Sequence, residues 1–366
     1  MKVLCNREQL REGLAIVNGV VPSKSTRPAI ENVCLVATEN SLELVGTDLE
    51  VAIRYRIDDV KVADTGTTLI PSRVALEFVR DLSGETVSID ATGDNCLITS
   101  EGDRVELVTM EADEFPVVAR FQDEASYPVM AETFSKQISR TSFAAAREPG
   151  RYAMHGILIE IENGQMRTVA TDGRRLAITT TVMDCPEGAS HRAIVPTKGL
   201  QMFSRLLHDP MERVRISFDE AQFCLKTEQA EIFARLIDGE FPKYSQVVPP
   251  EGACKVDADA SLLVNKLRLA STVTSADARA VKLMLTEDHL EIHAKATGRG
   301  KASGQMIVAY TGPDVDIAFN PDFIIEGLKQ CESDQVRLEF NDRTSPGKFS
   351  LGQEYIYVVM PITIDT

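Results

Sequence analysis

The sequence predicts an α+β fold in which one module of roughly 120 residues occurs three times. A short apolar strand, a proline and an amphipathic helix recur around Pro71, Pro196 and Pro321, at intervals of 125 residues. Alternating apolar and polar residues, as in RVRISFDEAQFCLKT, are typical of antiparallel strands joined by turns. A chain of 366 residues is also too long for a single ordinary core. We therefore expect three domains, at residues 1–125, 126–250 and 251–366.

Each module is expected to open with a helix and to continue with strands. Candidate first helices span residues 7–18, 132–146 and 260–274. Asp48 follows the first helix of the first module, and Asp172 follows that of the second, 124 residues later. Each lies between two strand-like runs where the chain needs a tight turn. The third copy has glycines at this point and no aspartate. The order within a module is therefore helix, strands, strand, helix, strands.

The second helix of each module follows the recurring proline. The three segments are TLIPSRVALEFVRDL, AIVPTKGLQMFSRLL and IAFNPDFIIEGLKQC. Proline suits the first helical turn because its missing N–H would be unpaired there in any case. Recurrence of the whole strand–proline–helix pattern argues against three unrelated domains.

Composition excludes several classes of protein. Apolar residues make up 43% of the chain and charged residues 26%, as is typical of globular proteins. No apolar run approaches the roughly 18 residues that a membrane-spanning helix needs, and Arg7 and Glu8 precede any apolar core of a signal peptide. Seven cysteines without a C-x-x-C pair indicate reduced thiols rather than disulfides or a zinc site. We therefore expect a cytoplasmic protein without membrane contact.

An enzyme is the first alternative for function. Asp48 with Glu50, and Asp172 with Arg174 and Arg175, could serve as acid–base groups. Asp48 and Glu50 alternate along a strand, however, and Asp-Gly is a common turn pair. The run GRGKASG lacks the order of a phosphate-binding loop. Two histidines four residues apart in DHLEIHA fit a solvated strand face better than a metal pair. We expect no catalytic residues, no metal and no cofactor.

The net charge of −16 argues against nucleic acid until the positions of the charges are considered. The six candidate helices with their flanks contain 14 Lys and Arg against 8 Asp and Glu. The helices are thus mildly basic, while the rest of the chain is strongly acidic. If the helices all face one way, one face attracts phosphates and the acidic body repels them. Modest charge suits a protein that slides along DNA rather than one that grips it.

The ends of a three-module chain would expose unpaired strand edges, which are sticky unless they are covered. Head-to-tail pairing of two chains would cover them and close a ring of six modules. The candidate edge strand in the first module is RVELVT at 104–109, and in this scheme LRLASTVTS at 267–275 in the third module lies nearby.

Five motifs resemble the bacterial sliding clamps, the beta subunits of DNA polymerase III. They are GTDLEVAIRY, TVATDGRRLA, IVPTKGL, DGEFPKY and the terminal YVVMPI, in the same order and spacing across essentially the whole chain. The resemblance implies three DNA-clamp domains in a ring-shaped head-to-tail homodimer, with helices lining the inside and antiparallel sheets outside. It implies a non-catalytic processivity factor that encircles duplex DNA without sequence preference. It also implies a clamp loader, the polymerase III alpha subunit and other proteins with clamp-binding motifs as partners.

The resemblance further implies a peptide-binding pocket between the second and third modules. The residues at the matching positions are Met154, Thr171, Gly173, Arg174, Arg175, Leu176, Pro242, Gln246, Val247, Phe323, Val358, Met360, Pro361 and Ile362. Methionine and leucine give a surface that adapts to several ligands. The chain departs from many relatives in having arginine at 174, histidine at 155 and threonine at 363.

Residues expected to face DNA lie on or beside the basic helices. They are Lys24, Arg27, Arg73, Arg80, Lys136, Arg140, Arg147, Tyr152, Lys198, Arg205, Lys266 and Arg268. The second alternative is an interaction scaffold that never meets DNA. It would share the repeats and the pocket, so only these basic helices distinguish it.

Overall fold

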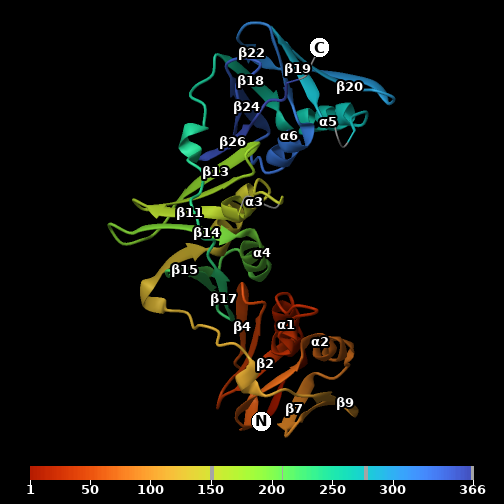
Figure 1. Cartoon of the computed structure of the whole chain (residues 1–366), viewed down its shortest axis with the longest axis vertical. Helices are drawn as coiled ribbons and strands as arrows, with labels where there is room; N and C mark the ends of the chain where they lie inside the picture. The colour runs from red at the N-terminus through yellow and green to blue at the C-terminus, as the bar shows by residue number, and fades with distance from the viewer. Residues whose placement is uncertain (149–151, 208, 276–278, 364–366) are drawn as a thin grey trace. The chain divides into compact units, whose positions relative to one another are not determined.

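The computed structural model describes residues 1–148, 152–207, 209–275 and 279–363 (Figure 1). Its contacts divide the chain into two compact units. Unit 1 comprises Met1–Phe134 and Lys198–Leu236, and unit 2 comprises Ser135–Thr197 and Ile237–Thr366. The fold is α+β with antiparallel sheets, as the sequence predicts.

The elements occur in nearly the same order three times along the chain, with one strand fewer between the two helices of the second repeat. The first repeat consists of β1 (Lys2–Asn6), α1 (Arg7–Asn18), β2 (Asn32–Ala37), β3 (Leu42–Thr47), β4 (Val51–Ile57), β5 (Lys61–Asp64), β6 (Gly66–Pro71), α2 (Ser72–Asp81), β7 (Thr86–Thr92), β8 (Asn95–Ser100) and β9 (Asp103–Val108). The second consists of β10 (Ser126–Met130), α3 (Ala131–Ser142), β11 (Gly156–Glu162), β12 (Gln165–Thr171), β13 (Arg175–Val182), β14 (Ser190–Pro196), α4 (Thr197–Leu206), β15 (Arg213–Phe218), β16 (Gln222–Lys226) and β17 (Ala230–Arg235). The third consists of β18 (Cys254–Asp259), α5 (Ala260–Ser271), β19 (Val281–Thr286), β20 (His289–Ala296), β21 (Gly300–Ile307), β22 (Ala309–Thr311), β23 (Val315–Phe319), α6 (Pro321–Leu328), β24 (Gln335–Phe340), β25 (Gly347–Gly352) and β26 (Tyr355–Val359).

The first helix of each repeat lies where the sequence predicts it, although α3 and α5 end earlier than expected. Local side chains start two of these helices. The Asn6 side chain accepts the N–H of Gln9 at 3.1 Å, and the Asp259 carboxylate accepts that of Leu262 at 2.6 Å. Both contacts satisfy backbone donors that a helix leaves unpaired at its start. In addition, a short strand precedes each first helix, and the helical pattern alone does not predict it.

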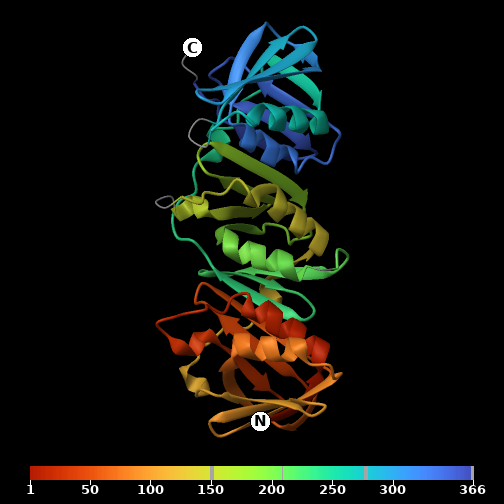
Figure 2. The same ribbon diagram turned by 90° about the vertical axis from the view of Figure 1, so that its right-hand side faces the viewer.

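The recurring proline marks the start of each second helix, as expected. Pro71 and Pro196 end their strands directly before the helix, whereas Pro321 is the first residue of α6 and Asn320 caps it. In Figure 2, α1 and α2 lie side by side in unit 1, and α5 and α6 do so in unit 2.

The sheets cross the repeat boundaries, so the compact units do not coincide with the repeats. In unit 1, β17 of the second repeat pairs with β4 of the first, within the order β10-β15-β16-β17-β4-β3-β2-β6. In unit 2, β13 of the second repeat pairs with β26 of the third, within the order β14-β11-β12-β13-β26-β25-β24-β18-β22. Each unit also has a smaller sheet, with the orders β5-β1-β7-β8-β9 and β21-β20-β19-β23. The middle repeat therefore contributes strands to both units.

Aromatic side chains fill the cores on either side of this division. In unit 1, Phe134, Phe203 and Phe223 pack with ring centroids 5.4 to 6.4 Å apart. In unit 2, Tyr357 lies 5.4 Å from Phe143, and its hydroxyl donates to the carbonyl of Phe323 at 2.9 Å. Such pairs add roughly 0.5–1.5 kcal/mol each beyond the area that they bury.

The described part of the chain contains no helix that is both long and apolar enough to span a membrane. Over the same residues, no cluster of three or more His, Cys, Asp or Glu has the arrangement of a metal site. All seven cysteines are free thiols, and five of them are buried. Burial raises the pKa of Cys5 and Cys224 to about 12.

Candidate functional site

A tight turn between β12 and β13 forms the centre of the site. The Asp172 carboxylate accepts the backbone N–H of Arg174 at 2.9 Å and that of Arg175 at 3.0 Å. The Thr171 hydroxyl donates to the Arg175 carbonyl at 2.6 Å and accepts the N–H of Gly173 at 3.0 Å. Gly173 has a φ of +83°, a conformation that glycine adopts without steric strain. Asp172 is therefore used in building the turn rather than exposed as an acid–base group.

Arg175 fixes this turn to the rest of unit 2. Its side chain is 8% exposed and donates to Asp172 at 3.1 Å, to the Phe143 carbonyl at 2.7 Å and to Glu326. The guanidinium also lies 4.5 Å from the ring centroid of Phe323. A buried cation needs this number of partners to offset its lost hydration. The Arg175 side chain therefore holds the turn in place against the rest of unit 2.

A small apolar pocket opens beside the turn, with a volume of about 100 Å³. Strands β13 and β26 form its floor, where Leu176 pairs with Val358. Its lining residues are Met154, Thr171, Gly173, Arg175, Leu176, Pro242, Tyr244, Val247, Val358 and Met360. Nine of these ten are residues that the sequence predicts for the peptide pocket.

Tyr244 is the lining residue that the prediction omits. Its hydroxyl donates to Glu160 and accepts a hydrogen bond from Arg167 at 3.4 Å. Burial, reinforced by the hydrogen bond to Glu160, raises the pKa of Tyr244. The motif DGEFPKY ends on this residue, so the motif itself could have indicated it.

A larger hollow of about 1130 Å³ adjoins the pocket and shares Met360 with it. Four further predicted residues line this hollow: Arg174, Phe323, Pro361 and Ile362. The C-terminal segment is held in place by two backbone bonds, from Met360 to the Arg174 carbonyl at 2.9 Å and from Ile362 to the Ala318 carbonyl at 2.7 Å. Gln246 is exposed at the end of a short 3-10 helix and lines neither cavity.

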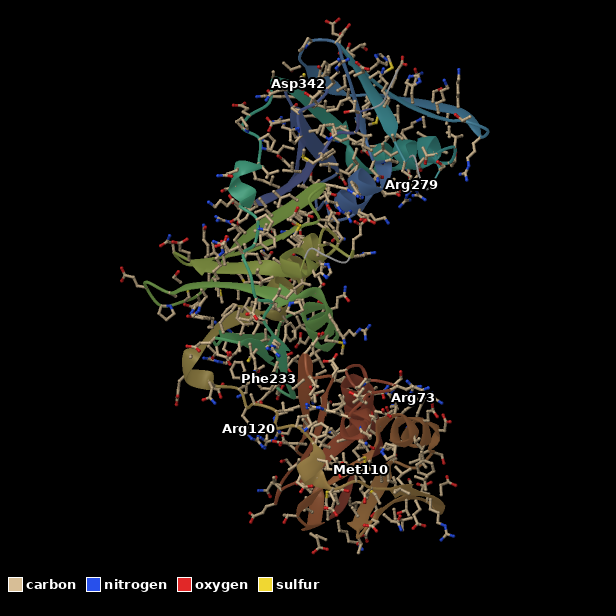
Figure 3. The ribbon with its side chains drawn as sticks, viewed as in Figure 1. Arg73, Met110, Arg120, Phe233, Arg279 and Asp342 are labelled. Atoms are coloured by element: carbon tan, nitrogen blue, oxygen red, sulfur yellow. The ribbon has the colours of Figure 1, made fainter. Side chains whose placement is uncertain are left out.

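The predicted DNA-facing residues are mostly exposed within their own units. In unit 1 all six of them are exposed: Lys24, Arg27, Arg73, Arg80, Lys198 and Arg205. Arg73 and Arg80 lie on α2, and Figure 3 labels Arg73 at the surface of this helix. Arg80 pairs with Asp81 at 3.0 Å, and Lys198 pairs with Asp48. The Arg80–Asp81 pair is exposed on both sides and is weak enough to exchange for a phosphate, whereas the Asp48 side chain is only 11% exposed.

In unit 2, Lys136, Arg147 and Arg268 are exposed, and Lys266 is half-buried. Arg140 is the least available residue of the set. Its side chain is 11% exposed, pairs with Glu332 at 2.5 Å and lies over the Tyr355 ring at 5.2 Å. The side chain of Tyr152 lies outside the described residues.

Comparison with protein-family models matches three successive domains. The N-terminal, central and C-terminal domains of the DNA polymerase III beta subunit match residues 1–119, 128–243 and 245–363, respectively. The chain belongs to the beta sliding clamp family. Its relatives include the beta sliding clamp of Proteus mirabilis, which is 31% identical over the full length of both chains, and that of Pseudomonas putida, which is 30% identical over the full length of both.

Solved structures of clamps have the same fold. The polymerase III beta subunit of Pseudomonas aeruginosa superposes with a TM-score of 0.96 at 29% identity, over all of both chains. A clamp from the same organism bound to griselimycin has a TM-score of 0.95 at 30% identity, again over all of both chains.

Membership of the clamp family resolves the two alternatives for function. The family is the processivity subunit of a polymerase and not an enzyme. Asp48 and Asp172, the residues that suggested acid–base chemistry, both hold turns through their carboxylates. The clamp works on DNA replication, which excludes a scaffold that never meets DNA.

Proposed function

We propose that two copies of this chain form a head-to-tail ring around duplex DNA and tether replication proteins through the pocket at Leu176 and Val358. The apolar pocket beside a fixed turn supports the tethering role. A closed ring cannot leave DNA sideways, so a tethered polymerase remains at high effective concentration. The partners would be the polymerase III alpha subunit, the clamp loader and other proteins with clamp-binding motifs, and the compartment would be the cytoplasm.

The pairing of strands at the repeat boundaries supports the dimer. At the first boundary β4 pairs with β17, and at the second β13 pairs with β26, both antiparallel. In each case the strand after the Asp turn pairs with the last strand of the next repeat. By the same rule, β21 of the third repeat would pair with β9 of the first repeat in a second copy.

Both of these strands are at the edge of a sheet. Each ends on an exposed apolar residue, Val108 at 70% and Ile307 at 77% exposure. Exposed apolar edges favour association, and pairing two of them removes both. Leu269, which is 63% exposed on α5, would add to this contact. The segment at 104–109, which the sequence analysis predicts to be an edge strand, lies mostly within β9.

Three clamp domains with boundaries at 125 and 250 fit this arrangement. The second repeat begins with β10 at Ser126, and the third begins with β18 at Cys254. The family matches pass from one domain to the next between residues 119 and 128 and between residues 243 and 245, the second a few residues before the proposed boundary.

Exposed cations on the helices support an electrostatic, sequence-independent contact with DNA. Non-specific binding of this type comes from neutralised phosphates and weakens with salt. Reversing Lys198 and Arg205 to glutamate should impair loading and sliding without changing the affinity of the pocket for peptides. DNA retention that survived several such reversals would contradict the proposed DNA face.

Sedimentation tests the dimer directly. The wild-type chain should sediment at twice 40.2 kDa, and the double variant Val108→Asp/Ile307→Asp should sediment as a folded monomer because it places two carboxylates in the pairing edge. The variant Val182→Asp changes another exposed valine, 83% exposed, outside both edges and should remain dimeric. A wild-type monomer, or an unchanged edge variant, would contradict the ring.

A further inference from the structure

The larger hollow beside the peptide pocket has a consistently positive lining. Five Lys and Arg residues contribute to it, and none of the described residues that line it is Asp or Glu: the cations are Arg174, Arg279, Lys282, Lys295 and Lys301. Figure 3 labels Arg279 in this region of unit 2. The whole chain has a net charge of −16, so the excess of cations among these described residues differs from the average composition of the chain. Such a local field attracts anionic groups.

The cations come mainly from one face of the four-stranded sheet. Lys282 on β19 pairs with His293 on β20, and His293 pairs with Ser303 on β21. Two residues further along β20, Lys295 lies directly opposite Lys301. The side chains of this face alternate with buried apolar residues such as Ile292 that form the core. The sheet therefore holds these charges in fixed relative positions.

Three of the five cations already have acidic partners. Arg279 pairs with Asp322, Lys282 pairs with Asp316, and Arg174 lies 3.9 Å from Glu148. Lys295 and Lys301 have no hydrogen-bond or ion-pair partner among the described residues, and both are exposed. Like charges directly opposite each other on neighbouring strands destabilise a sheet. An anion between them would relieve this repulsion.

The hollow and the peptide pocket are continuous at Met360, which lines both. The backbone of Met360 is fixed to the Arg174 carbonyl, so the two cavities keep one geometry within unit 2. A peptide whose apolar side chains occupy the pocket at Leu176 would pass Met360 and enter the cationic hollow.

We infer that the hollow binds acidic side chains of the partner segment that flank its apolar anchor. This inference rests on the proposed peptide pocket and names the chemistry of the adjoining segment. A single-stranded nucleic acid is less suitable, because such ligands need stacked aromatic platforms and Phe323 is the one aromatic ring, histidine aside, in the lining. Acidic residues would raise the association rate as well as the affinity, since charge complementarity steers encounter.

Fluorescence anisotropy with matched peptides tests the inference. The four peptides share one clamp-binding anchor from the polymerase alpha subunit. Two of them are extended by three aspartates, one at the N-terminal end and the other at the C-terminal end. The other two have three asparagines at the same positions. At about 50 mM salt, one of the Asp-extended peptides should bind wild-type clamp about tenfold more tightly than its Asn counterpart. This advantage should shrink to less than about twofold at 0.5 M salt.

Clamp variants locate the effect. Lys295→Glu/Lys301→Glu, assayed as a dimer by sedimentation because Lys301 lies on the proposed dimer edge β21, should abolish the Asp advantage and leave the affinity for the Asn-extended peptides unchanged. Lys61→Glu/Arg213→Glu makes the same charge change at two exposed positions of unit 1 and should leave the advantage intact. Lys295→Gln/Lys301→Gln should lose most of the advantage while remaining at least as thermally stable as wild type, which separates binding from folding.

The outcomes distinguish the two proposals. If the Asn-extended peptides fail to bind wild type, the pocket itself is wrong. If they bind and aspartates at neither end add affinity, the pocket stands and the acidic-segment inference is overturned. If an oligo-dT strand displaces the Asp-extended peptide and binds more tightly than it, the hollow is a nucleic-acid site and the inference is also overturned.

Discussion

Two turns in this clamp have the same backbone and different surroundings. One joins β3 to β4 at Thr47–Val51, and the other joins β12 to β13 at Thr171–Arg175. In each, the aspartate accepts two backbone N–H groups and the threonine hydroxyl donates to the carbonyl four residues ahead. The third residue has a positive φ in both, +76° at Leu49 and +83° at Gly173. The repeat therefore reproduces the turn in detail.

The side chains around the two turns differ. Long apolar residues such as Met154, Leu176 and Met360 border the turn of unit 2 and leave a small pocket. The hollow beside the turn of unit 1, about 310 Å³, is lined by apolar residues such as Leu49 and Phe233 and also by the charged residues Glu50 and Arg235. The same backbone thus borders a small apolar pocket in unit 2 and a larger hollow with charged residues in its lining in unit 1.

An ion pair of low exposure also lies beside the hollow of unit 1. Arg54 donates to the carbonyls of Val118 and Ala119 at 2.7 and 3.0 Å, and it pairs with Glu43 at 3.2 Å. Glu43 binds Arg120 as well, at 3.0 Å (Figure 3 labels Arg120 and Phe233). These contacts fix the segment that follows Phe115-Pro116. The difference teaches that neighbouring side chains, rather than the turn, decide what kind of cavity each copy borders.

Removing the C-terminal segment should give the largest effect. Deletion of residues 360–366 removes Met360 from the pocket and both backbone bonds that hold the segment, while β26 ends before it at Val359. We expect more than roughly 100-fold weaker binding of an alpha-subunit peptide with an intact dimer. The matched change in unit 1, Leu49→Asp/Val117→Asp, alters two exposed residues, at 46% and 100%, and should leave affinity within about twofold. Equal losses in both variants would contradict the difference between the turns.

The two turn aspartates should differ in their contribution to stability. Asp172→Ala removes the oxygen that accepts two backbone N–H groups and one partner of the buried Arg175, so we expect a loss of about 2–3 kcal/mol. Asp48→Ala removes the same turn bonds, but its remaining partner is Lys198, which is 55% exposed, and we expect about 1 kcal/mol. Thermal unfolding of both variants measures the difference, and a larger loss for Asp48→Ala would reverse the argument.

Exchanging the third residue of the turns gives a smaller effect. Gly173→Leu places a side chain at positive φ and should destabilise unit 2 by roughly 1–2 kcal/mol. Leu49→Gly relieves the same strain in unit 1 and should change stability by less than about 1 kcal/mol, in the stabilising direction. Chemical denaturation of both proteins would contradict this reasoning if Leu49→Gly proved the more damaging change.

Tyr244→Phe should have the smallest effect and should depend on pH. The pKa of Tyr244 is raised, so its hydrogen bond to Glu160 contributes fully below the ordinary tyrosine value of about 10 and is lost as pH rises through the raised value. We expect the variant to be less stable by under about 1 kcal/mol at pH 8. The gap should close at higher pH. A gap that does not change with pH would show that titration of the Tyr244 hydroxyl is not linked to stability.

The repeat could be predicted from the sequence because the residues that start its helices and form its turns act over only a few neighbouring residues. Pro71, Pro196 and Pro321 mark helix starts, and Asp48 and Asp172 mark turns, through chemistry confined to a few residues. The short strands that precede the first helix of each repeat were not predicted. One of them, β10, contains Pro128 and lies at the edge of its sheet, where a missing N–H is tolerated although it weakens the strand pattern.

Contacts between distant segments could not be predicted from residue patterns. The pairing of β4 with β17, and of β13 with β26, joins residues far apart in the chain, and nothing in the alternation of either strand specifies its partner. Most of the residues that line the pocket at Leu176 could nevertheless be predicted, position by position, from the resemblance to clamps. The cationic face of β19–β21 was missed because Lys295 and Lys301 become neighbours only through strand register.

Retention on DNA of defined topology tests the ring most directly. Clamp loaded onto a nicked circular plasmid by its loader and ATP should remain bound through gel filtration, and it should be released when a restriction enzyme linearises the plasmid, because a closed ring slides off a free end. The edge variant Val108→Asp/Ile307→Asp should not be retained on either form. Equal retention of wild type before and after linearisation would mean that the protein grips DNA by affinity, and it would contradict the encircling ring.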